Sequence, residues 1–202
     1  MTSRQFICRT ARVLAFFGAV GIMTSTPAWS GERNAPQTSA ATLSFAGVDY
    51  LHRWSRAGQH EFTPRSDADL ERWQDMVTIN VHDAVRNGDQ LANAANQVLG
   101  KYQSRGNIMR TDSRPRTPQR PAEHLIVAVL GSPGFLEAAF ARFALVDGIG
   151  VVTVYSHRIY GTAVGDAMSA WLNANGAAME QKLIAWDRMP SVSALRQLPQ
   201  SR

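Results

Sequence analysis

The stretch from Ala122 to Gly161 constrains the fold more than any other part of the sequence. Leu125–Leu130 is an apolar run with no polar side, which is typical of a strand that is covered on both faces. Val151–Ile159 is rich in β-branched and aromatic residues and predicts a second strand. Two strands so close in the chain indicate that the protein is built around a sheet.

The segment between these strands, Phe135–Val146, fits two patterns. A helix would use the spacing of Leu136, Phe140 and Phe143 as its apolar stripe. A strand would make an antiparallel meander, because both flanking turns are short and rich in glycine. We favour the meander.

Other elements follow from the spacing of apolar residues. Asp75–His82 alternates between polar and apolar residues and predicts a strand with one apolar face. Residues 90–104 predict an amphipathic helix, and Asp89 is the expected cap. The remaining predictions are a strand near Val48–Trp54, a helical turn near Ser66–Arg72, an extended segment after Gly106, and a helix over Val164–Asp187 that could break at Asn175–Gly176.

The order of these elements is strands, a helix, consecutive strands and a long helix. Consecutive strands predict an antiparallel sheet in an α+β domain. Because Leu125–Leu130 is apolar on both sides, we expect helices packed on both faces of the sheet. The predicted architecture is a three-layer α/β/α sandwich.

The N-terminus has the organisation of a secretory signal peptide. Basic residues precede the apolar run Val13–Met23, and small residues precede Gly31. The run is shorter than the ~20 residues that span a bilayer, so we expect cleavage after residue 30 and export to the periplasm. The alternative is an uncleaved anchor.

The rest of the chain divides by composition. Residues 31–44 are small and polar and predict a disordered spacer. Residues 45–189 form one α+β domain, and residues 190–202 are a tail that we expect to fray. After cleavage, no segment is expected to span the membrane.

Charge and cysteine content exclude several classes of function. The chain has 21 Lys and Arg against 16 Asp and Glu, but three of the arginines lie in the predicted signal peptide. The remaining balance of +2 is too small to indicate nucleic-acid binding. Cys8 is the one cysteine, so the mature chain has no disulfide, thiolate metal site or cysteine nucleophile.

Four stretches of the sequence resemble uncharacterised secreted proteins of Gram-negative bacteria. They are "GQHEFTP", "DMVTINV", "RPAEHLIVAV" and "VVTVYSHRIYG", and the resemblance runs from Val48 to about Trp186. It implies no known activity. The order of elements is also similar to the Mog1/PsbP-like fold, which implies an antiparallel sheet between helices in a non-catalytic accessory or binding protein.

Ser156, His157 and Arg158 suggest an enzymatic cluster at first sight. Successive side chains of a strand point to opposite faces, so His157 shares a face with Tyr155, and Ser156 shares the other with Arg158. Adjacent Ser and His therefore cannot act together, and no G-x-S-x-G motif is present. We predict no catalytic residue here.

The histidines and glycines predict no metal or cofactor. None of the five histidines is spaced for a metal site. Neither G-x-x-x-x-G-K-[ST] nor G-x-G-x-x-G occurs, so no nucleotide site is expected.

The densest basic segment is the best candidate for a binding surface. It contains Arg105, Arg110, Arg114, Arg116 and Arg120. Guanidinium groups bind carboxylates and phosphates in bidentate fashion, so the segment could dock an envelope protein or an anionic surface. The alternative is a solvated edge strand and loop, in which charge and proline block strand addition.

Trp54 and Trp73 are further candidates, because they could line a groove near the "GQHEFTP" loop. The alternative is that both are core residues.

The sequence thus favours a non-enzymatic periplasmic protein that binds a partner or supports an envelope assembly. One alternative is a hydrolase that uses His157, or His124 with Glu123. Another is a small-ligand carrier with a deep apolar cavity between sheet and helix.

Overall fold

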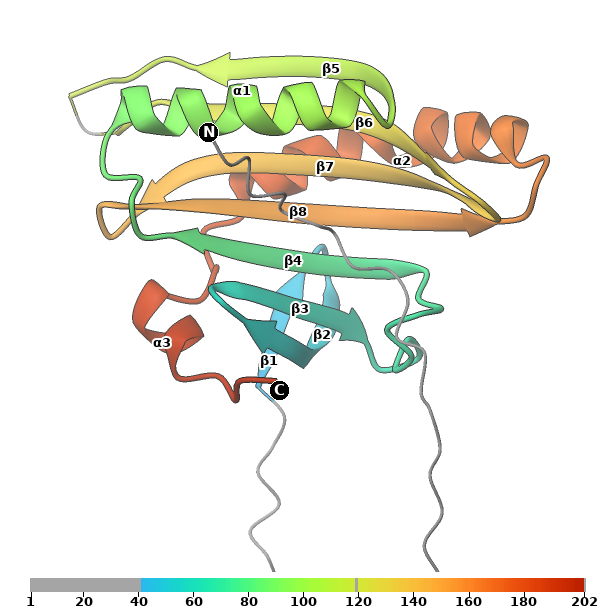
Figure 1. Ribbon diagram of the computed structural model, residues 1–202, viewed down its shortest axis with the longest axis horizontal. Helices are drawn as coiled ribbons and strands as arrows, with labels where there is room; N and C mark the ends of the chain where they lie inside the picture. Colours follow the sequence, from blue (N-terminus) through green and yellow to red (C-terminus); the bar gives the residue numbers. More distant parts are fainter. Residues whose placement is uncertain (1–40, 119, 202) are drawn as a thin grey trace, which may run out of the picture. The chain divides into compact units, whose positions relative to one another are not determined.

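The computed structural model describes residues 41–118 and 120–201. Their strands form one antiparallel sheet in the order β1-β2-β3-β4-β8-β7-β6-β5 (Figure 1). The strands are β1 (Thr42–Phe45), β2 (Val48–Arg56), β3 (Gln59–Pro64), β4 (Asp75–His82), β5 (Gly106–Arg114), β6 (Glu123–Ser132), β7 (Phe135–Val146) and β8 (Ile149–Tyr160). The helices are α1 (Gly88–Gln103), α2 (Gly165–Ala185) and α3 (Val192–Arg196). The predicted α+β class with an antiparallel sheet is confirmed.

The meander predicted for the middle of the chain is confirmed, because β6, β7 and β8 are neighbours in the sheet. Phe140 and Phe143, which would share one stripe of a helix, point to opposite faces of β7. Both rings are fully buried, each in a different core cluster. The turn to β8 also suits a tight hairpin, since Asp147 and Gly148 both have positive φ (52° and 73°), as in a type I′ turn.

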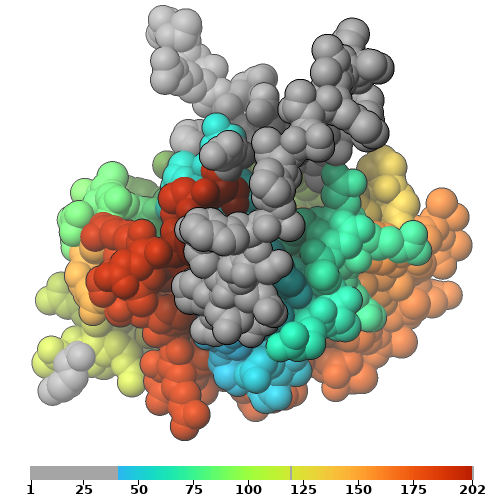
Figure 2. Space-filling view, turned by 90° about the horizontal axis from the view of Figure 1, so that it is seen from below, coloured from blue at the N-terminus to red at the C-terminus, as the bar shows by residue number. Residues whose placement is uncertain are grey.

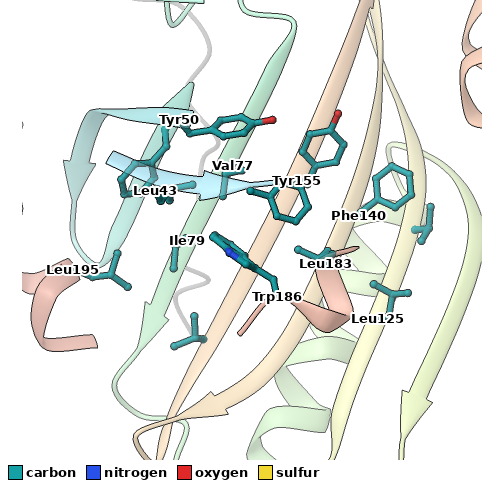
Figure 3. Close-up of a cluster of buried hydrophobic side chains, with 14 of the residues drawn as sticks. Leu43, Tyr50, Val77, Ile79, Leu125, Phe140, Tyr155, Leu183, Trp186 and Leu195 are labelled. Carbon is teal, nitrogen blue, oxygen red and sulfur yellow. The ribbon is translucent and has the colours of Figure 1, made fainter. Parts of the chain in front are cut away.

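The two long helices belong to different core clusters. α1 contacts β5, β6 and β7, and α2 contacts β7 and β8. Ile126 of β6 packs with Leu91 of α1, whereas its neighbour Leu125 packs in the cluster that contains Leu183 of α2 (Figure 3). Burial of each such leucine stabilises the fold by about 1.5–3 kcal/mol. The apolar run of β6 therefore supplies both cores.

Details of both helices differ from the sequence prediction. The side chain that caps α1 is Asn87, whose Oδ1 accepts from the Gln90 N–H at 2.9 Å, and Asp89 lies in the first turn. Asp89 was predicted because its carboxylate can cap equally well. α2 continues through Asn175–Gly176, where the Asn175 side chain donates to the Trp171 carbonyl at 3.0 Å.

The folded region extends beyond both predicted boundaries. β1 begins at Thr42, inside the predicted spacer, because Leu43 and Phe45 are buried and β1 pairs with β2. α3 lies inside the tail that we expected to fray, and Val192 and Leu195 are buried there. The predicted signal peptide, residues 1–30, and spacer residues 31–40 lie outside the described residues.

The segment after β3 forms turns where a short helix was predicted at Ser66–Arg72. Two backbone hydrogen bonds close these turns, from Asp67 N–H to the Pro64 carbonyl and from Arg72 N–H to the Asp69 carbonyl. The Asp67 carboxylate accepts from the backbone N–H groups of Gln74 and Asp75, which competes with helix formation.

Candidate functional site

The connection between β5 and β6 is a hairpin that continues beyond the sheet. The Thr117 N–H donates to the Arg120 carbonyl at 2.9 Å, and the Arg120 N–H donates back at 3.3 Å. We call residues 114–122 the arginine arm; Gln119, within it, lies outside the described residues. Figure 1 shows the connection at the upper left, and Figure 2 shows this yellow-green part of the chain at the lower left.

Prolines make the arginine arm stiff. Pro115, Pro118 and Pro121 each fix φ and lack an N–H group. The arm therefore keeps an extended shape with little loss of entropy on binding, and it resists pairing with a further strand.

The arm carries three arginines that the rest of the described chain does not neutralise. Arg114, Arg116 and Arg120 are exposed, and among the described residues none of them pairs with a carboxylate. Arg110, in contrast, lies 3.2 Å from both Asp112 and Glu180. The predicted basic run is thus split: Arg110 is paired, whereas Arg105 and the three arginines of the arm are exposed without a carboxylate partner among the described residues.

Glu123 is close to the arm but is not available to it. Its carboxylate accepts two hydrogen bonds from Arg142, at 3.0 and 3.1 Å. The Arg142 guanidinium also donates to the carbonyls of Leu183 and Trp186, so it caps the C-terminal end of α2. Glu123 and Arg142 are therefore a structural pair that ties β6 and β7 to α2.

His124, the other half of the proposed hydrolase pair, points away from Glu123. Its Nδ1 lies 2.9 Å from Ser113 Oγ on β5, and burial lowers the pKa of its imidazole. Glu123 and His124 line the same small pocket, but Glu123 is bound to Arg142 and His124 to Ser113, so the two side chains do not pair with each other.

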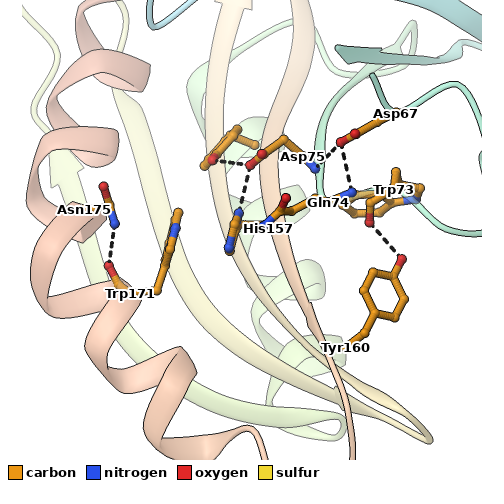
Figure 4. Close-up of polar contacts among 9 residues, drawn as sticks. Asp67, Trp73, Gln74, Asp75, His157, Tyr160, Trp171 and Asn175 are labelled. Atoms are coloured by element: carbon orange, nitrogen blue, oxygen red, sulfur yellow. Dashed lines mark hydrogen bonds and ion pairs between the residues drawn. The ribbon is translucent and has the colours of Figure 1, made fainter. Parts of the chain in front are cut away.

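The expected separation of Ser156, His157 and Arg158 is confirmed. His157 stacks on Trp171 of α2, with ring centroids 4.0 Å apart and planes at 6°. Its Nδ1 lies 2.9 Å from Asp75 Oδ1 (Figure 4). The Tyr155 hydroxyl donates to the same oxygen at 2.7 Å, and burial is the main cause that raises the pKa of this phenol. These contacts fasten α2 and β4 to β8.

Arg158, on the opposite face of β8, is held between two aromatic rings. Its guanidinium carbon lies 3.8 Å from the ring centroid of Trp73 and 4.2 Å from that of Phe135. Its Nε donates to Glu137 at 2.8 Å. Such cation–π contacts stabilise by about 0.5–2 kcal/mol each.

Of the two candidate tryptophans, Trp73 is a core residue. It is 3% exposed, and its carbonyl accepts from the Tyr160 hydroxyl at 2.8 Å (Figure 4). Trp54 is half-buried on β2, opposite Glu61 of β3. Burial raises the pKa of the Glu61 carboxyl.

A groove of about 350 Å³ lies at one end of the sheet. It is lined by the turn between β6 and β7, from Ser132 to Leu136, and by the loop between β8 and α2, from Gly161 to Gly165. This groove lies between two connections, whereas a small-ligand carrier would need a cavity between the sheet and a helix.

The sequence did not predict the polar cluster of His52, Ser55 and His60, which are joined by side-chain hydrogen bonds. A strict alternation along β2 would place His52 and Ser55 on opposite faces. A β-bulge between His52 and Trp54 brings them to the same face. No pattern in the sequence marks this bulge.

The described residues contain neither a metal-binding cluster nor a membrane-spanning helix. No group of three or more His, Cys, Asp or Glu side chains is arranged to hold a metal ion. No helix in this part of the chain is long and apolar enough to cross a membrane.

No protein-family model and no curated protein matches the chain. Among solved structures, it is similar to the Ran-binding protein Mog1p of Saccharomyces cerevisiae, with a TM-score of 0.42 and 10% identity, covering 72% of this chain and 92% of Mog1p. It is also similar to human STARD10, with a TM-score of 0.28 and 10% identity, covering 68% of this chain and 74% of STARD10. Both similarities are distant, and neither assigns a function to this chain.

Proposed function

We propose that this chain is a non-enzymatic accessory protein of the cell envelope that binds an acidic partner protein through the arginine arm. The observation that carries the proposal is the group of Arg114, Arg116 and Arg120, exposed on a proline-stiffened hairpin without carboxylate partners among the described residues. The periplasmic location rests on the signal-peptide pattern of residues 1–30 and on the resemblance to secreted proteins of Gram-negative bacteria.

The composition of the arm favours a protein over a lipid surface. Guanidinium groups match carboxylates with two parallel hydrogen bonds, which gives direction as well as attraction. The described part of the arm has no large apolar side chain that could insert into a bilayer. Carboxylates on an acidic protein surface are therefore the partner that fits best.

The pairing of the titratable groups supports a non-enzymatic role. Glu123 binds Arg142, His124 binds Ser113, and His157 binds Asp75. Each contact joins two neighbouring strands, and although Glu123 and His124 line one small pocket, they are bound to different partners there. The three-layer arrangement belongs to the same proposal, in which α1 and α2 cover the β5–β8 half of the sheet.

Binding can be tested with the mature chain, from Gly31, and a triple variant Arg114→Gln/Arg116→Gln/Arg120→Gln. We expect the variant to bind immobilised poly-glutamate at least about tenfold more weakly, because each lost charge-assisted contact costs on the order of 1 kcal/mol. The acidic protein captured from envelope extracts by the wild type should be absent with the variant.

A matched control removes three exposed arginines elsewhere, in Arg56→Gln/Arg65→Gln/Arg188→Gln. Equal losses in both triple variants would show a mere net-charge effect and contradict the proposal. Binding to phosphatidylglycerol vesicles, but to no acidic protein, would assign the arm to the membrane and also contradict it.

A further inference from the structure

His52, Ser55 and His60 form a chain of hydrogen bonds, which we call the His-Ser-His chain, and its His52 end is half-buried. Ser55 Oγ lies 2.6 Å from His52 Nε2 and 2.7 Å from His60 Nδ1. Ser55 is fully buried and His60 is 2% exposed. The Nε2 atom of His60 is buried and has no hydrogen-bond partner among the described residues.

Both hydrogen bonds of the His-Ser-His chain can form in one arrangement of protons. The Ser55 hydroxyl has one proton, so it donates to one imidazole and accepts from the other. We assign the proton of His60 to Nδ1, which donates to Ser55, and the Ser55 proton to the bond with His52 Nε2. This arrangement leaves no buried N–H group without an acceptor at His60, and both imidazoles are neutral.

An added proton breaks this arrangement wherever it binds. On His60 it places an N–H at the buried Nε2, which has no acceptor. On His52 it turns the Nε2 atom into a donor, so that Ser55 must donate to His60 and the His60 proton must move to Nε2. Either way a donor is buried without a partner, which costs about 1–3 kcal/mol before the buried charge is considered.

The backbone of Ser55 also anchors the C-terminal segment of the protein. We call Val192–Ser201, which includes α3, the C-terminal strap. The Ser201 N–H donates to the Ser55 carbonyl at 2.7 Å, and the Ser55 N–H donates to Ser201 Oγ at 3.3 Å. One serine therefore links the His-Ser-His chain, by its side chain, to the strap, by its backbone.

The strap also packs over this end of the sheet. Its residues Val192 and Leu195 are buried in the core cluster that contains Ile79 of β4 (Figure 3). Ile79 lies directly opposite His60 in the register of β3 and β4. α1 and α2 pack against β5 to β8, and the strap covers this end together with Trp186, whose ring centroid lies 5.1 Å from that of Phe45 on β1.

No described acidic group faces the two imidazoles to compensate a charge. β4 presents Ile79 beside His60, and β1 presents the buried Leu43 and Phe45 on the same face. The described part of the strap has a single charged residue, Arg196, and it pairs with Asp83 after β4 at 2.5 Å.

The neighbouring tyrosine on this face, Tyr50, has a pKa raised by burial and is neutral near pH 7. Burial is also the largest cause that lowers the pKa of both histidines, and for His60 the nearby His52 adds to it.

We propose that the C-terminal strap is a pH-operated cover, docked while His52 and His60 are both neutral and released when they are protonated. Release admits water to the imidazoles, which then titrate near the ordinary histidine value of about 6.5. The undocked state therefore binds more protons than the docked state below this pH. Docking is strongest above pH 6.5 and weakens as the pH falls below it.

Hydrogen–deuterium exchange of the mature chain measures this directly. Between pH 7.5 and 5.5, after correction for intrinsic rates, we expect the protection factors of Val192–Ser201 to fall at least about tenfold, because each imidazole can contribute up to tenfold per pH unit. The protection of α1 should fall less than that of the strap. An unchanged strap, or an equal fall in α1, would overturn the proposal.

Substitutions test whether the pH dependence of strap protection arises from the His-Ser-His chain. In His52→Gln/His60→Leu, the dependence of strap protection on pH should disappear. The pH dependence of strap protection should persist in His124→Gln. This control removes a histidine on β6 whose pKa is also lowered by burial. Loss of the dependence in His124→Gln would contradict the assignment. If the double variant does not fold, the wild-type measurement decides alone.

Discussion

Asp75 is the residue on which most of the polar order around β8 depends. One of its carboxylate oxygens accepts from the Tyr155 hydroxyl and contacts His157 Nδ1. His157 in turn stacks on Trp171, so a single oxygen positions two strands and a helix. The reactive appearance of Ser156-His157-Arg158 in the sequence thus comes from residues that serve packing on two different faces.

Replacement of this residue, Asp75→Ala, should destabilise the fold by about 2–4 kcal/mol, because it leaves a buried phenol and a buried imidazole without their acceptor. Urea unfolding followed by tryptophan fluorescence measures the change. Asp49→Ala removes an exposed carboxylate on β2 and should change the free energy of unfolding by less than about 0.5 kcal/mol. A similar effect of both substitutions would rule out a special role for Asp75.

Between elements, the structure uses ion pairs of two kinds. Arg142 and Glu123 have side chains only 15% and 11% exposed, and they join β6 and β7 to the end of α2. Arg110 and Glu180 also join the sheet to α2, but the Arg110 side chain is 56% exposed. A buried pair is costly to break because one charge stays behind without a partner.

The substitution Arg142→Met should therefore cost about 3–5 kcal/mol, since it strands the Glu123 carboxylate and removes two donors from the last turn of α2. Arg110→Met should cost at most about 1 kcal/mol, because solvent screens that pair. Chemical denaturation of both variants checks the difference. In Arg142→Met/Glu123→Met, part of the lost stability should return. A double variant no more stable than Arg142→Met would show that the stranded charge is not the cause.

The elements that could be predicted from the sequence are those whose burial follows from the pattern of their own residues. β6, β7 and β8 are apolar enough, and their turns short enough, to specify a meander from local pattern alone. β1 and α3 could not be predicted, because each is short and depends on burying two side chains against distant strands. The His-Ser-His chain depends on a bulge, and a shift of one residue along a strand reverses the face of every side chain that follows.

The arginine arm could be predicted from the sequence, because a segment rich in charged residues and prolines is expected to be exposed whatever the tertiary fold. The division of the basic run from Arg105 to Arg120 was not predictable, because Arg110 is neutralised by Glu180, which comes from α2, far along the chain. Local composition thus predicted the basic run as a candidate binding surface, and the tertiary fold determined which of its arginines are paired.

At the scale of the whole molecule, buried histidines and tyrosines limit the pH range of stability. Burial lowers the pKa of His52, His60 and His124. The unfolded chain therefore takes up more protons than the folded chain below pH 6.5, and stability falls as the pH decreases through this range. The tyrosines act at the other end, because burial raises the pKa of Tyr50 and Tyr155.

These opposite shifts predict a plateau of maximal stability between about pH 6.5 and pH 10. Above pH 10 the unfolded chain loses phenolic protons that the folded chain retains, so the free energy of unfolding should decrease again. Urea unfolding at intervals from pH 5 to pH 11 should give a decrease of at least about 1 kcal/mol at each end. In His52→Gln/His60→Leu the acidic decrease should become smaller and the alkaline decrease should remain. A stability that keeps rising as the pH falls from 6.5 to 5 would contradict the histidine shifts, since it would require the folded chain to bind the additional protons.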